Sequence, residues 1–444
     1  MGRTLLKGGR VIDPAREIDD VRDVLIEGET IVRVDRGIAS TPGDQVIGCN
    51  GLIVAPGFVD MHVHLREPGR EDRETIESGG RAAAAGGFTA VACMPNTQPV
   101  NDDQSVTEFI TAQARRGSPV RVHPIGAITK GLAGEELSEI GELVRLGCVA
   151  VSDDGRPVVS GFVMRKALEY AHMFGIPVIN HAQDLSLSND GVMNEGFHST
   201  VLGLRGMHAS AEEVMVYRDI RLAEATGGRL HVPHISTARS VDLVRDAKRR
   251  GVPVTCEVTP HHFALTDEAV FGYDTNTKMN PPLRCEQDRV AILEGIADGT
   301  IDAVASDHAP HCQEEKEVEY DLAPFGVVGL ETSVSLGLDR LVHAGHIDLT
   351  RFVRLYSTNP ARMLGLPGGS LSAGSPADVT VLSTSREITV DPARFRSKSR
   401  NTPFIGWTLR GGVMLTLVGG RVVFAAEESA PERPGRTAAG SDPG

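Results

Sequence analysis

The sequence predicts an α/β protein: a (β/α)8 TIM-like barrel with a small composite β-sandwich domain formed by both termini. Two observations predict it. Eight short apolar β-runs alternate with helical stretches in the middle of the chain, and β-rich runs with glycine-containing turns occupy both ends. The 444 residues, 41% of them hydrophobic, suffice for one domain of about 250 residues or more plus a smaller one. An open doubly wound sheet is the alternative, but no G-x-G-x-x-G fingerprint follows the first strand.

The two ends of the chain resemble each other in pattern. Residues 4 to 55 and residues 377 to 424 both alternate short β-rich runs with glycine turns, which is typical of antiparallel hairpins. From Glu427 onward the chain has almost no large apolar residues, as disordered segments do. We therefore predict the N-terminal part of a β domain over 1–55, the barrel over 56–368, the C-terminal part of the β domain over 369–425 and a disordered tail over 426–444.

The barrel prediction depends on eight apolar runs and the helices between them. The runs begin at Gly57, Phe88, Val120, Cys148, Pro177, Leu230, Pro253 and Ile301. One of the intervening helices is expected from Ser210 to Ala225, where Ser210 and Glu213 have the spacing of a capping box.

Polar side chains gather where these runs end. They are His62, His64 and Arg66 on the first run, Asn96 after the second, Asp153 and Asp154 on the fourth, His181 on the fifth, His234 on the sixth and Asp307 on the eighth. The ends of barrel strands converge on one face, which carries the catalytic groups of such enzymes. We therefore expect these residues to surround the mouth of the barrel.

The row of side chains on the first run indicates a metal site. His62 and His64 are two residues apart, so on a strand both imidazoles project to the same side. Imidazole and carboxylate are the ligands of a catalytic Zn²⁺ that keeps a position open for water. Four histidines and two carboxylates at the strand ends are enough for two ions that share a bridging ligand.

Composition excludes several classes of function. The 45 basic residues against 59 acidic ones give a formal charge of −14, which argues against a nucleic-acid or anionic-membrane surface. Any anionic ligand then needs a local cationic site. The six cysteines are scattered without a C-x-x-C pair, no secretory leader precedes them and no apolar run reaches the length of a membrane span, so we expect a cytoplasmic protein.

Seven segments in order, "VDMHVHLREPG", "MPNT", "SDDG", "NHAQD", "HVPHIST", "TKMNPPLR" and "SDHAPH", resemble the amidohydrolase superfamily and, within it, the type I bacterial dihydroorotases. The resemblance extends over residues 5 to 424. It implies reversible cyclisation of N-carbamoyl-L-aspartate to (S)-dihydroorotate plus water, the third step of pyrimidine (UMP) biosynthesis. It also implies a small-molecule substrate and a homo-oligomer, and it leaves open a complex with aspartate carbamoyltransferase.

The same resemblance implies the metal ligands. His62 and His64 hold the first zinc together with Asp307, His181 and His234 hold the second, and Asp154 bridges the two, with Asp153 as the alternative bridge. Hydantoinases, dihydropyrimidinases and allantoinases use a carboxylated lysine as the bridge near the end of the fourth strand. The fourth run here has aspartates and no lysine, and Lys130 lies after the third strand, where we expect it to be exposed.

The expected chemistry is hydrolysis of a cyclic amide and its reverse. Asp307 would take a proton from the attacking water and pass it to the leaving ring nitrogen, unless it is a ligand only. Arg66, on the strand face of the two histidines, can form a bidentate pair with a substrate carboxylate, whereas an ion pair with Glu67 would be a purely structural role. The resemblance adds His64, Asn96, Asn280, His311, Phe325 and Gly326 as substrate contacts.

Three alternatives stay open at this point. The chain could be another cyclic amidohydrolase of the allantoinase or hydantoinase type, an inactive dihydroorotase-like scaffold subunit of aspartate carbamoyltransferase, or a metal-binding structural protein. Two structural details also stay open. The charged segment that begins at His311 could be a mobile loop beside the mouth or a solvated connector. His123, His261 and His262 also follow strand-like runs, so they are candidates to support the ligands without binding metal.

Overall fold

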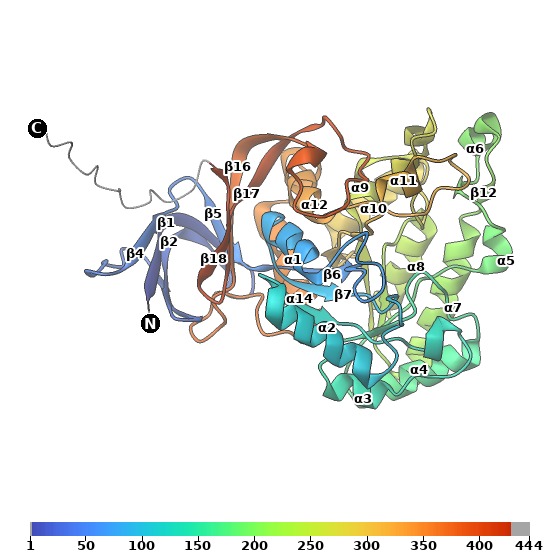
Figure 1. Ribbon diagram of the computed structural model, residues 1–444, viewed down its shortest axis with the longest axis horizontal. Helices are drawn as coiled ribbons and strands as arrows, with labels where there is room; N and C mark the ends of the chain where they lie inside the picture. The colour runs from blue at the N-terminus through green and yellow to red at the C-terminus, as the bar shows by residue number, and fades with distance from the viewer. Residues whose placement is uncertain (1, 428–444) are drawn as a thin grey trace, which may run out of the picture.

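The computed structural model describes residues 2–427 (Figure 1). The disordered tail predicted over 426–444 therefore lies, beyond Glu427, outside the described residues. Within the described range, no helix has both the length and the hydropathy that crossing a lipid bilayer requires.

Eight parallel strands form the centre of the larger part of the molecule. They are β6 (Phe58–Val63), β7 (Phe88–Cys93), β8 (Arg121–Pro124), β9 (Val151–Ser152), β10 (Val178–Ile179), β13 (Leu230–Val232), β14 (Val254–Val258) and β15 (Ala303–Val304). They pair as β6-β7-β8 and as β15-β14-β13-β10-β9. Isolated parallel bridges from Gly126 to Val151 and from Val63 to His308 join the two sheets at both edges, so the ring is continuous. The predicted α/β barrel is confirmed, and each of the eight predicted runs contains one of these strands.

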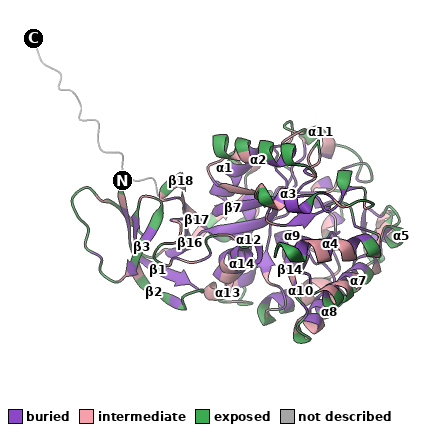
Figure 2. Cartoon of the chain, turned by 90° about the horizontal axis from the view of Figure 1, so that it is seen from below, coloured by how far each residue is buried: buried purple, intermediate pink, exposed green. Residues whose placement is uncertain are grey.

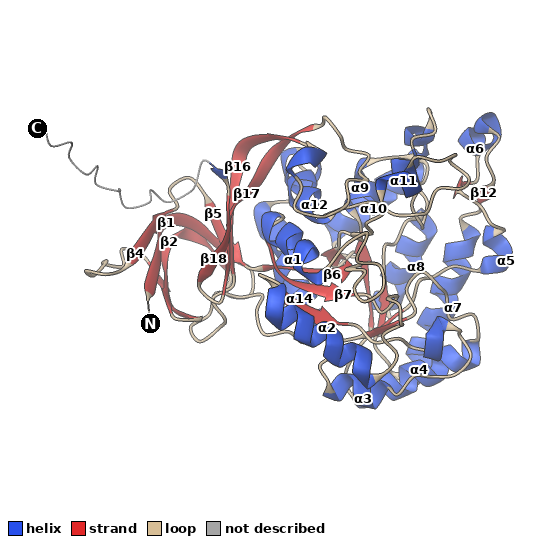
Figure 3. Cartoon of the chain, viewed as in Figure 1, coloured by secondary structure: helices blue, strands red, loops and turns tan. Residues whose placement is uncertain are grey.

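Helices cover the outside of this ring (Figure 3). Those that follow the strands are α1 (Ile76–Ala85), α2 (Gln104–Gly117), α3 (Ile140–Arg145), α4 (Gly161–Met173), α7 (Ser210–Thr226), α8 (Ala238–Arg249), α10 (Glu286–Asp298) and α12 (Leu330–Gly337). Shorter elements are α5 (Leu185–Ser188), α6 (Phe197–Leu202), α9 (Pro260–Ala264), α11 (Gln313–Lys316), α13 (Leu349–Val353), α14 (Asn359–Leu364), β11 (Met193–Asn194) and β12 (Gly206–Met207). All six residues of β6 and of β7 are buried, as expected of parallel strands covered on both faces.

The start of α7 differs from the sequence-based prediction. The capping box at Ser210 and Glu213 does not form, because the residue before the helix, Ala209, is itself helical at φ −55° and carries no capping side chain. Ser210 therefore lies inside the first turn, where a side chain cannot cap the helix as a residue in an extended conformation does. The Ser210 amide instead donates to His208 Nδ1 at 3.1 Å.

The two ends of the chain build one eight-stranded sheet. Its strands are β1 (Arg3–Asp13), β2 (Ile18–Glu27), β3 (Thr30–Asp35), β4 (Gln45–Gly48), β5 (Ile53–Pro56), β16 (Val379–Thr389), β17 (Thr408–Val418) and β18 (Arg421–Ala425). The order is β18-β17-β16-β5-β1-β2-β3, with β4 paired to β1. The antiparallel contact of β5 with β16 joins the N-terminal strands to the C-terminal ones. Not every contact is a hairpin, because β4 and β5 run parallel to β1.

The two largest apolar clusters reflect this arrangement. The terminal sheet encloses its own cluster, in which Leu6 and Val24 from the N-terminal strands pack with Val381 and Leu415 from the C-terminal ones. The larger cluster lies between the barrel strands and their helices. Figure 2 shows the buried residues concentrated on the central strands and the exposed ones on the outer faces of the helices. Burial of the strands leaves only their ends, and the loops after them, to carry chemistry.

Candidate metal centre

The six predicted ligands all lie at or after the C-terminal ends of barrel strands. His62 is in β6 and His64 follows it, and the other four follow β9, β10, β13 and β15: Asp154, His181, His234 and Asp307. Each of the six is at most 8% exposed. The parallel ring therefore brings residues that are up to 245 positions apart in the chain to one end of the barrel.

The backbone at this end is unusual. His234 and Asp307 have φ values of 36° and 47°, and Arg66 has 61°. Residues other than glycine seldom adopt this left-handed conformation, and such residues cluster at functional sites, where surrounding structure holds them in place. Three of the eight such residues outside glycine in the described chain belong to the predicted site.

A first group consists of His62, His64 and Asp154, whose potential ligand atoms all lie within 4.8 Å of one another. His62 Nε2 lies 3.4 Å from Asp154 Oδ1, and His64 Nε2 lies 3.4 Å from Asp154 Oδ2. Asp307 Oδ1 is close to both imidazoles, at 3.5 Å from His62 Nε2 and 3.2 Å from His64 Nε2. Two imidazoles and two carboxylates thus face one small volume.

A second group consists of Asp154, His181 and His234. His181 Nδ1 lies 3.0 Å from His234 Nε2, and Asp154 Oδ1 lies 3.9 Å and 3.7 Å from these two nitrogens. Asp154 is the member that the two groups share. A carboxylate that lies between two groups of imidazoles in this way is placed as a ligand shared by two ions would be.

Unpartnered polar atoms test whether these residues fit a metal. Among the described residues, His62 Nε2, Asp154 Oδ1 and His234 Nδ1 are buried without a hydrogen-bond partner. Buried polar atoms are nearly always satisfied, by protein, water or an ion. Burial disfavours the charged form of Asp154, yet His62, His234 and His64 around it hold its pKa well below the ordinary value. An anionic carboxylate among imidazoles is a donor set that suits Zn²⁺.

Asp153, the alternative bridge, and Lys130, the nearby lysine, both make contacts elsewhere. The carboxylate of Asp153 accepts hydrogen bonds from the Ile128 and Thr129 amides at 2.8 and 3.0 Å and from the Thr129 hydroxyl, so it holds the loop after the third strand. Lys130 pairs with Glu136 and half of its side chain is exposed, as predicted. Neither side chain belongs to the two groups.

Glu257 is a member of the site that the sequence analysis missed. This glutamate of β14 is 1% exposed, and its carboxylate accepts a hydrogen bond from His62 Nδ1 at 2.8 Å. Burial alone would raise its pKa, but hydrogen bonds from His231 and His62 hold the pKa at about 2. The ionised carboxylate fixes the ring of His62 so that Nε2 points to Asp154, as carboxylate partners of metal-binding histidines do. An acidic residue inside the apolar run "PVTCEVTP" was the available signal.

Arg66 lies beside the first group. A cavity of about 360 Å³ is lined by Arg66, Arg70, Arg73, Asn96, Asp154 and Arg156, among others. Arg70 and Arg73 pair with Glu315, whereas Arg66 has no ion pair within residues 2–427 and donates only to the Pro310 carbonyl at 3.3 Å. Glu67 does not pair with it and instead accepts from the Ile76 amide. Burial and nearby Arg73 lower the pKa of Arg66 to about 10, so it stays cationic at neutral pH.

The two asparagines predicted as substrate contacts, Asn96 and Asn280, each lie against a histidine of one of the two His/Asp groups. Asn96 Oδ1 lies 2.8 Å from His64 Nδ1, and its amide donates to the Asp154 carbonyl at 3.4 Å. Asn280 donates to Gln183 Oε1 at 2.8 Å and lies 3.3 Å from His181 Nε2. Gln183, which also lies 2.9 Å from His181 Nε2, is a second residue that the sequence analysis missed.

The predicted contacts from the last barrel loop lie close to one another. His311 Nε2 is 2.8 Å from the Phe325 carbonyl, and a Cβ on Gly326 would come within 2.7 Å of Ala309, so only glycine fits there. The segment after His311 is not a purely solvated connector, because Lys316 and Tyr320 are buried and Lys316 donates to the Thr275 and Pro324 carbonyls.

The remaining candidate histidines have other surroundings. His262 lies 2.7 Å from the Thr259 hydroxyl and 3.1 Å from the Pro281 carbonyl, in α9 rather than on a strand. Its neighbour His261 is buried, and burial together with His262 keeps its pKa well below the ordinary value. His123 in β8 has a pKa lowered to about 4 by burial and by Arg121. None of the three belongs to the metal groups among the described residues.

Comparison with known proteins places this parallel (β/α)8 barrel, with its two His/Asp groups at the mouth, among the amidohydrolases. The family model described as dihydro-orotase-like matches residues 51–240, and one described as amidohydrolase family matches residues 335–424. Among solved structures, an L-hydantoinase (dihydropyrimidinase) from Arthrobacter aurescens superposes with a TM-score of 0.86 at 25% identity, covering 95% of this chain and 96% of that one. A dihydropyrimidinase from Brevibacillus agri shares the fold at a TM-score of 0.83, with 22% identity and 95% and 94% coverage.

Comparison with sequence relatives identifies the family more specifically than the solved structures do. A dihydroorotase from Pelotomaculum thermopropionicum is 57% identical over 95% of this chain and 98% of its own length. A dihydroorotase from Geobacter metallireducens is 54% identical over 95% and 99%. At this identity and coverage, the chain belongs to the dihydroorotase family, and the resemblance inferred from the seven sequence segments is confirmed.

Proposed function

We propose that this protein is a zinc-dependent dihydroorotase that interconverts N-carbamoyl-L-aspartate and (S)-dihydroorotate in the biosynthesis of pyrimidines. The observation that carries the proposal is the pair of His/Asp groups joined through Asp154, with the cationic side chain of Arg66 in the adjoining cavity. Membership of the family supports the reaction, and the chemistry of the donor set supports zinc.

The residues divide into holding and reacting roles. His62, His64 and Asp307 would hold the first ion, His181 and His234 the second, and Asp154 both. When bound, zinc supplies Lewis-acid chemistry, because it polarises an amide carbonyl oxygen and makes water more acidic. Arg66 binds the substrate carboxylate, which is the only group of dihydroorotate that carries a full charge. In this protein of net charge −14, the cavity needs such a local cation.

Asp307 moves the proton in either direction. In hydrolysis its carboxylate takes a proton from the attacking water and gives it to the ring nitrogen as the carbon–nitrogen bond breaks. In cyclisation it takes a proton from the attacking nitrogen and gives it to the departing oxygen. Asn96, Asn280, His311 and the backbone of Phe325 and Gly326 orient the ring, and His64 contributes from the first group.

The competing functions make different demands on the site. A hydantoinase or allantoinase site bridged by lysine would need that residue near the end of the fourth strand, where this chain has Asp153 and Asp154. An inactive scaffold subunit would need none of the six ligand positions, and all six are occupied by histidine or aspartate. The cationic wall of the cavity favours an anionic dihydropyrimidine over a neutral one.

A single assay tests the proposal. The purified protein is given dihydroorotate, N-carbamoyl-aspartate, allantoin and dihydrouracil side by side, with zinc measured by elemental analysis. We expect turnover of the first two and one to two zinc ions per chain. Faster turnover of allantoin or dihydrouracil, or no turnover by zinc-loaded protein, would contradict the proposal.

The balance between the two directions gives a further test. Ring closure converts a dianion into a monoanion and consumes a proton, so the equilibrium moves toward dihydroorotate as the pH falls. Measuring both directions between about pH 6 and 9 checks this. A balance that does not move toward the ring at the acid end would show that a different reaction is being followed.

The proposal includes the cellular compartment and the partners of the enzyme. All six cysteines are free thiols in the described structure, which fits the reducing cytoplasm. A homo-oligomer and a complex with aspartate carbamoyltransferase stay predictions. Size-exclusion chromatography of the protein alone and mixed with that enzyme tests both.

A further inference from the structure

The last barrel loop, residues 309–328, carries predicted substrate contacts at both of its ends. His311 lies at its beginning, and Phe325 and Gly326 lie at its end. The two ends meet, because the Ala309 amide donates to the Val327 carbonyl at 2.8 Å and His311 Nε2 lies 2.8 Å from the Phe325 carbonyl. The position of His311 relative to the Phe325–Gly326 backbone therefore depends on how these ends are held together.

One side chain from outside the barrel holds both ends. Asn401 lies between β16 and β17 and is 6% exposed. Its Oδ1 accepts from the His311 amide at 3.2 Å, and its Nδ2 donates to the carbonyls of Ala309 and Gly326 at 3.2 and 3.1 Å. Its backbone carbonyl accepts from the Val328 amide at 2.8 Å. Both side-chain polar atoms of Asn401 are thus used on this loop.

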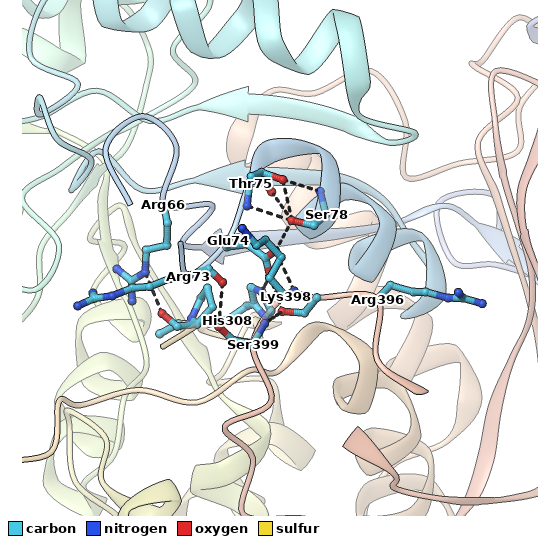
Figure 4. A network of polar contacts seen from close by, with 12 residues as sticks. Arg66, Arg73, Glu74, Thr75, Ser78, His308, Arg396, Lys398 and Ser399 are labelled. Carbon is cyan, nitrogen blue, oxygen red and sulfur yellow. Dashed lines mark hydrogen bonds and ion pairs between the residues drawn. The ribbon is translucent and has the colours of Figure 1, made fainter. Parts of the chain in front are cut away.

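The segment that carries Asn401 is anchored to the loop after the first barrel strand through Glu74, whose polar contacts are drawn in Figure 4. Glu74, which is fully buried, accepts hydrogen bonds from the Ser397 hydroxyl and from the Lys398 amide at 3.2 Å. His308 Nε2 lies 3.2 Å from the same carboxylate, and the Ser399 hydroxyl donates to the Arg73 carbonyl at 2.8 Å. Residues 397–401 therefore contact the loop after the first strand, which carries Arg66, and the loop after the eighth, which carries Asp307.

We propose that Asn401 is a positioning residue, which clamps the two ends of the 309–328 loop so that His311 and the Phe325–Gly326 backbone present one arrangement to the substrate. A neutral amide suits this role because it accepts and donates at the same time, toward an N–H on one side and two carbonyl oxygens on the other. A carboxylate of the same size could accept but would face two carbonyl oxygens without a proton to share. The inference rests on the proposed function, since the contacts that it orients are those of a dihydroorotase.

The test compares Asn401→Ala and Asn401→Asp with a matched control, Asn359→Ala. Asn359 is 5% exposed and also donates to a backbone carbonyl, that of Asp302 at 2.8 Å, but Asp302 lies at the opposite end of β15 from Asp307. For both Asn401 variants we expect the KM for dihydroorotate to rise roughly ten- to a hundredfold, because displaced contacts weaken substrate binding. Zinc content should stay at the wild-type value, and the control should keep the wild-type KM.

Hydrogen exchange gives a readout that does not depend on activity. The amide of His311, which loses its side-chain acceptor in Asn401→Ala, should exchange faster in that variant than in the wild type and the control. A role in stability alone would lower kcat through loss of active protein and leave KM unchanged, and a role in filling space would be restored by aspartate. Either of those results overturns the proposal, and Asn401→Asp decides it by itself if the alanine variant does not fold.

If the proposed function were wrong, the same experiments would give a different pattern of results. In that case the zinc-loaded wild type would not turn over dihydroorotate, while the exchange measurement would still report whether Asn401 clamps the loop. Wild-type turnover with an unchanged KM in both variants rejects the positioning role and leaves the proposed function intact.

Discussion

The two His/Asp groups share Asp154 but are supported in different ways. In the first group, His62 donates to the buried carboxylate of Glu257, and His64 Nδ1 lies against Asn96. In the second, the partners of His181 outside the group are the neutral amides of Gln183 and Asn280. A carboxylate partner makes an imidazole a stronger ligand than an amide does and fixes its ring more firmly. We therefore expect the first group to hold metal more tightly than the second.

The largest effect should come from removing one histidine of each group. We expect His62→Ala and His181→Ala both to lose activity to the background level, because each removes an imidazole that no other described side chain replaces. The comparison predicts that His181→Ala keeps one metal ion and that His62→Ala loses at least the tighter one. Elemental analysis after dialysis measures this.

Chelation of the wild type sharpens the same comparison. Gradual removal of metal should proceed in two steps if the groups differ in affinity. Wild-type metal content in both alanine variants would show that these histidines are not ligands, and a single step of removal would show that the groups do not differ.

A variant of Asp307 distinguishes the role of holding metal from the role of transferring a proton. Asp307→Asn should lower kcat by about a hundred- to ten-thousandfold in both directions, since the amide cannot accept and return a proton. The variant should still fold and retain at least part of its metal, because His62, His64 and Asp154 remain. Substantial activity in the variant would assign Asp307 a role as ligand only.

Glu257 tests the support of the first group directly. Glu257→Gln keeps the size of the side chain and removes the charge, and we expect metal affinity to fall by about 10- to 100-fold. Gln183→Ala, the corresponding change in the second group, should have a smaller effect because it removes a neutral partner. Titration of the metal-free proteins against a chelator of known affinity measures both. Equal losses would contradict the difference between the groups.

The smallest effects are expected at the substrate contacts beside the two groups. Arg66→Met should lower kcat/KM for dihydroorotate by roughly ten- to a hundredfold, and Arg66→Lys should recover little, because a point charge does not reproduce the planar guanidinium. Asn280→Ala, beside the second group, should cost about fivefold, as for one neutral hydrogen bond. Any turnover of dihydrouracil should be unaffected by Arg66→Met. Equal losses on both substrates would assign Arg66 a structural role.

Much of the site could be predicted because its polar residues stand at the ends of apolar runs, where they can be recognised from the local sequence. The spacing of His62 and His64 on one strand is readable without a structure, and so are the polar residues that end the other runs. The choice between Asp153 and Asp154 depended on the resemblance to a family, because adjacent residues carry the same functional group. Only their surroundings distinguish them, since Asp153 is used by the backbone of Ile128 and Thr129.

The sequence by itself determined the barrel and the candidate ligands, because burial on both faces leaves a continuous apolar run for each strand and places the polar residues at its end. Only the tertiary structure decided which distant residues support them. Glu257 reaches His62 across 195 positions of the chain and Asn401 reaches His311 across 90, and no periodicity or local spacing records such a contact. A hydrogen bond needs its two atoms within about 3 Å of each other, a condition that folding sets and separation along the chain does not.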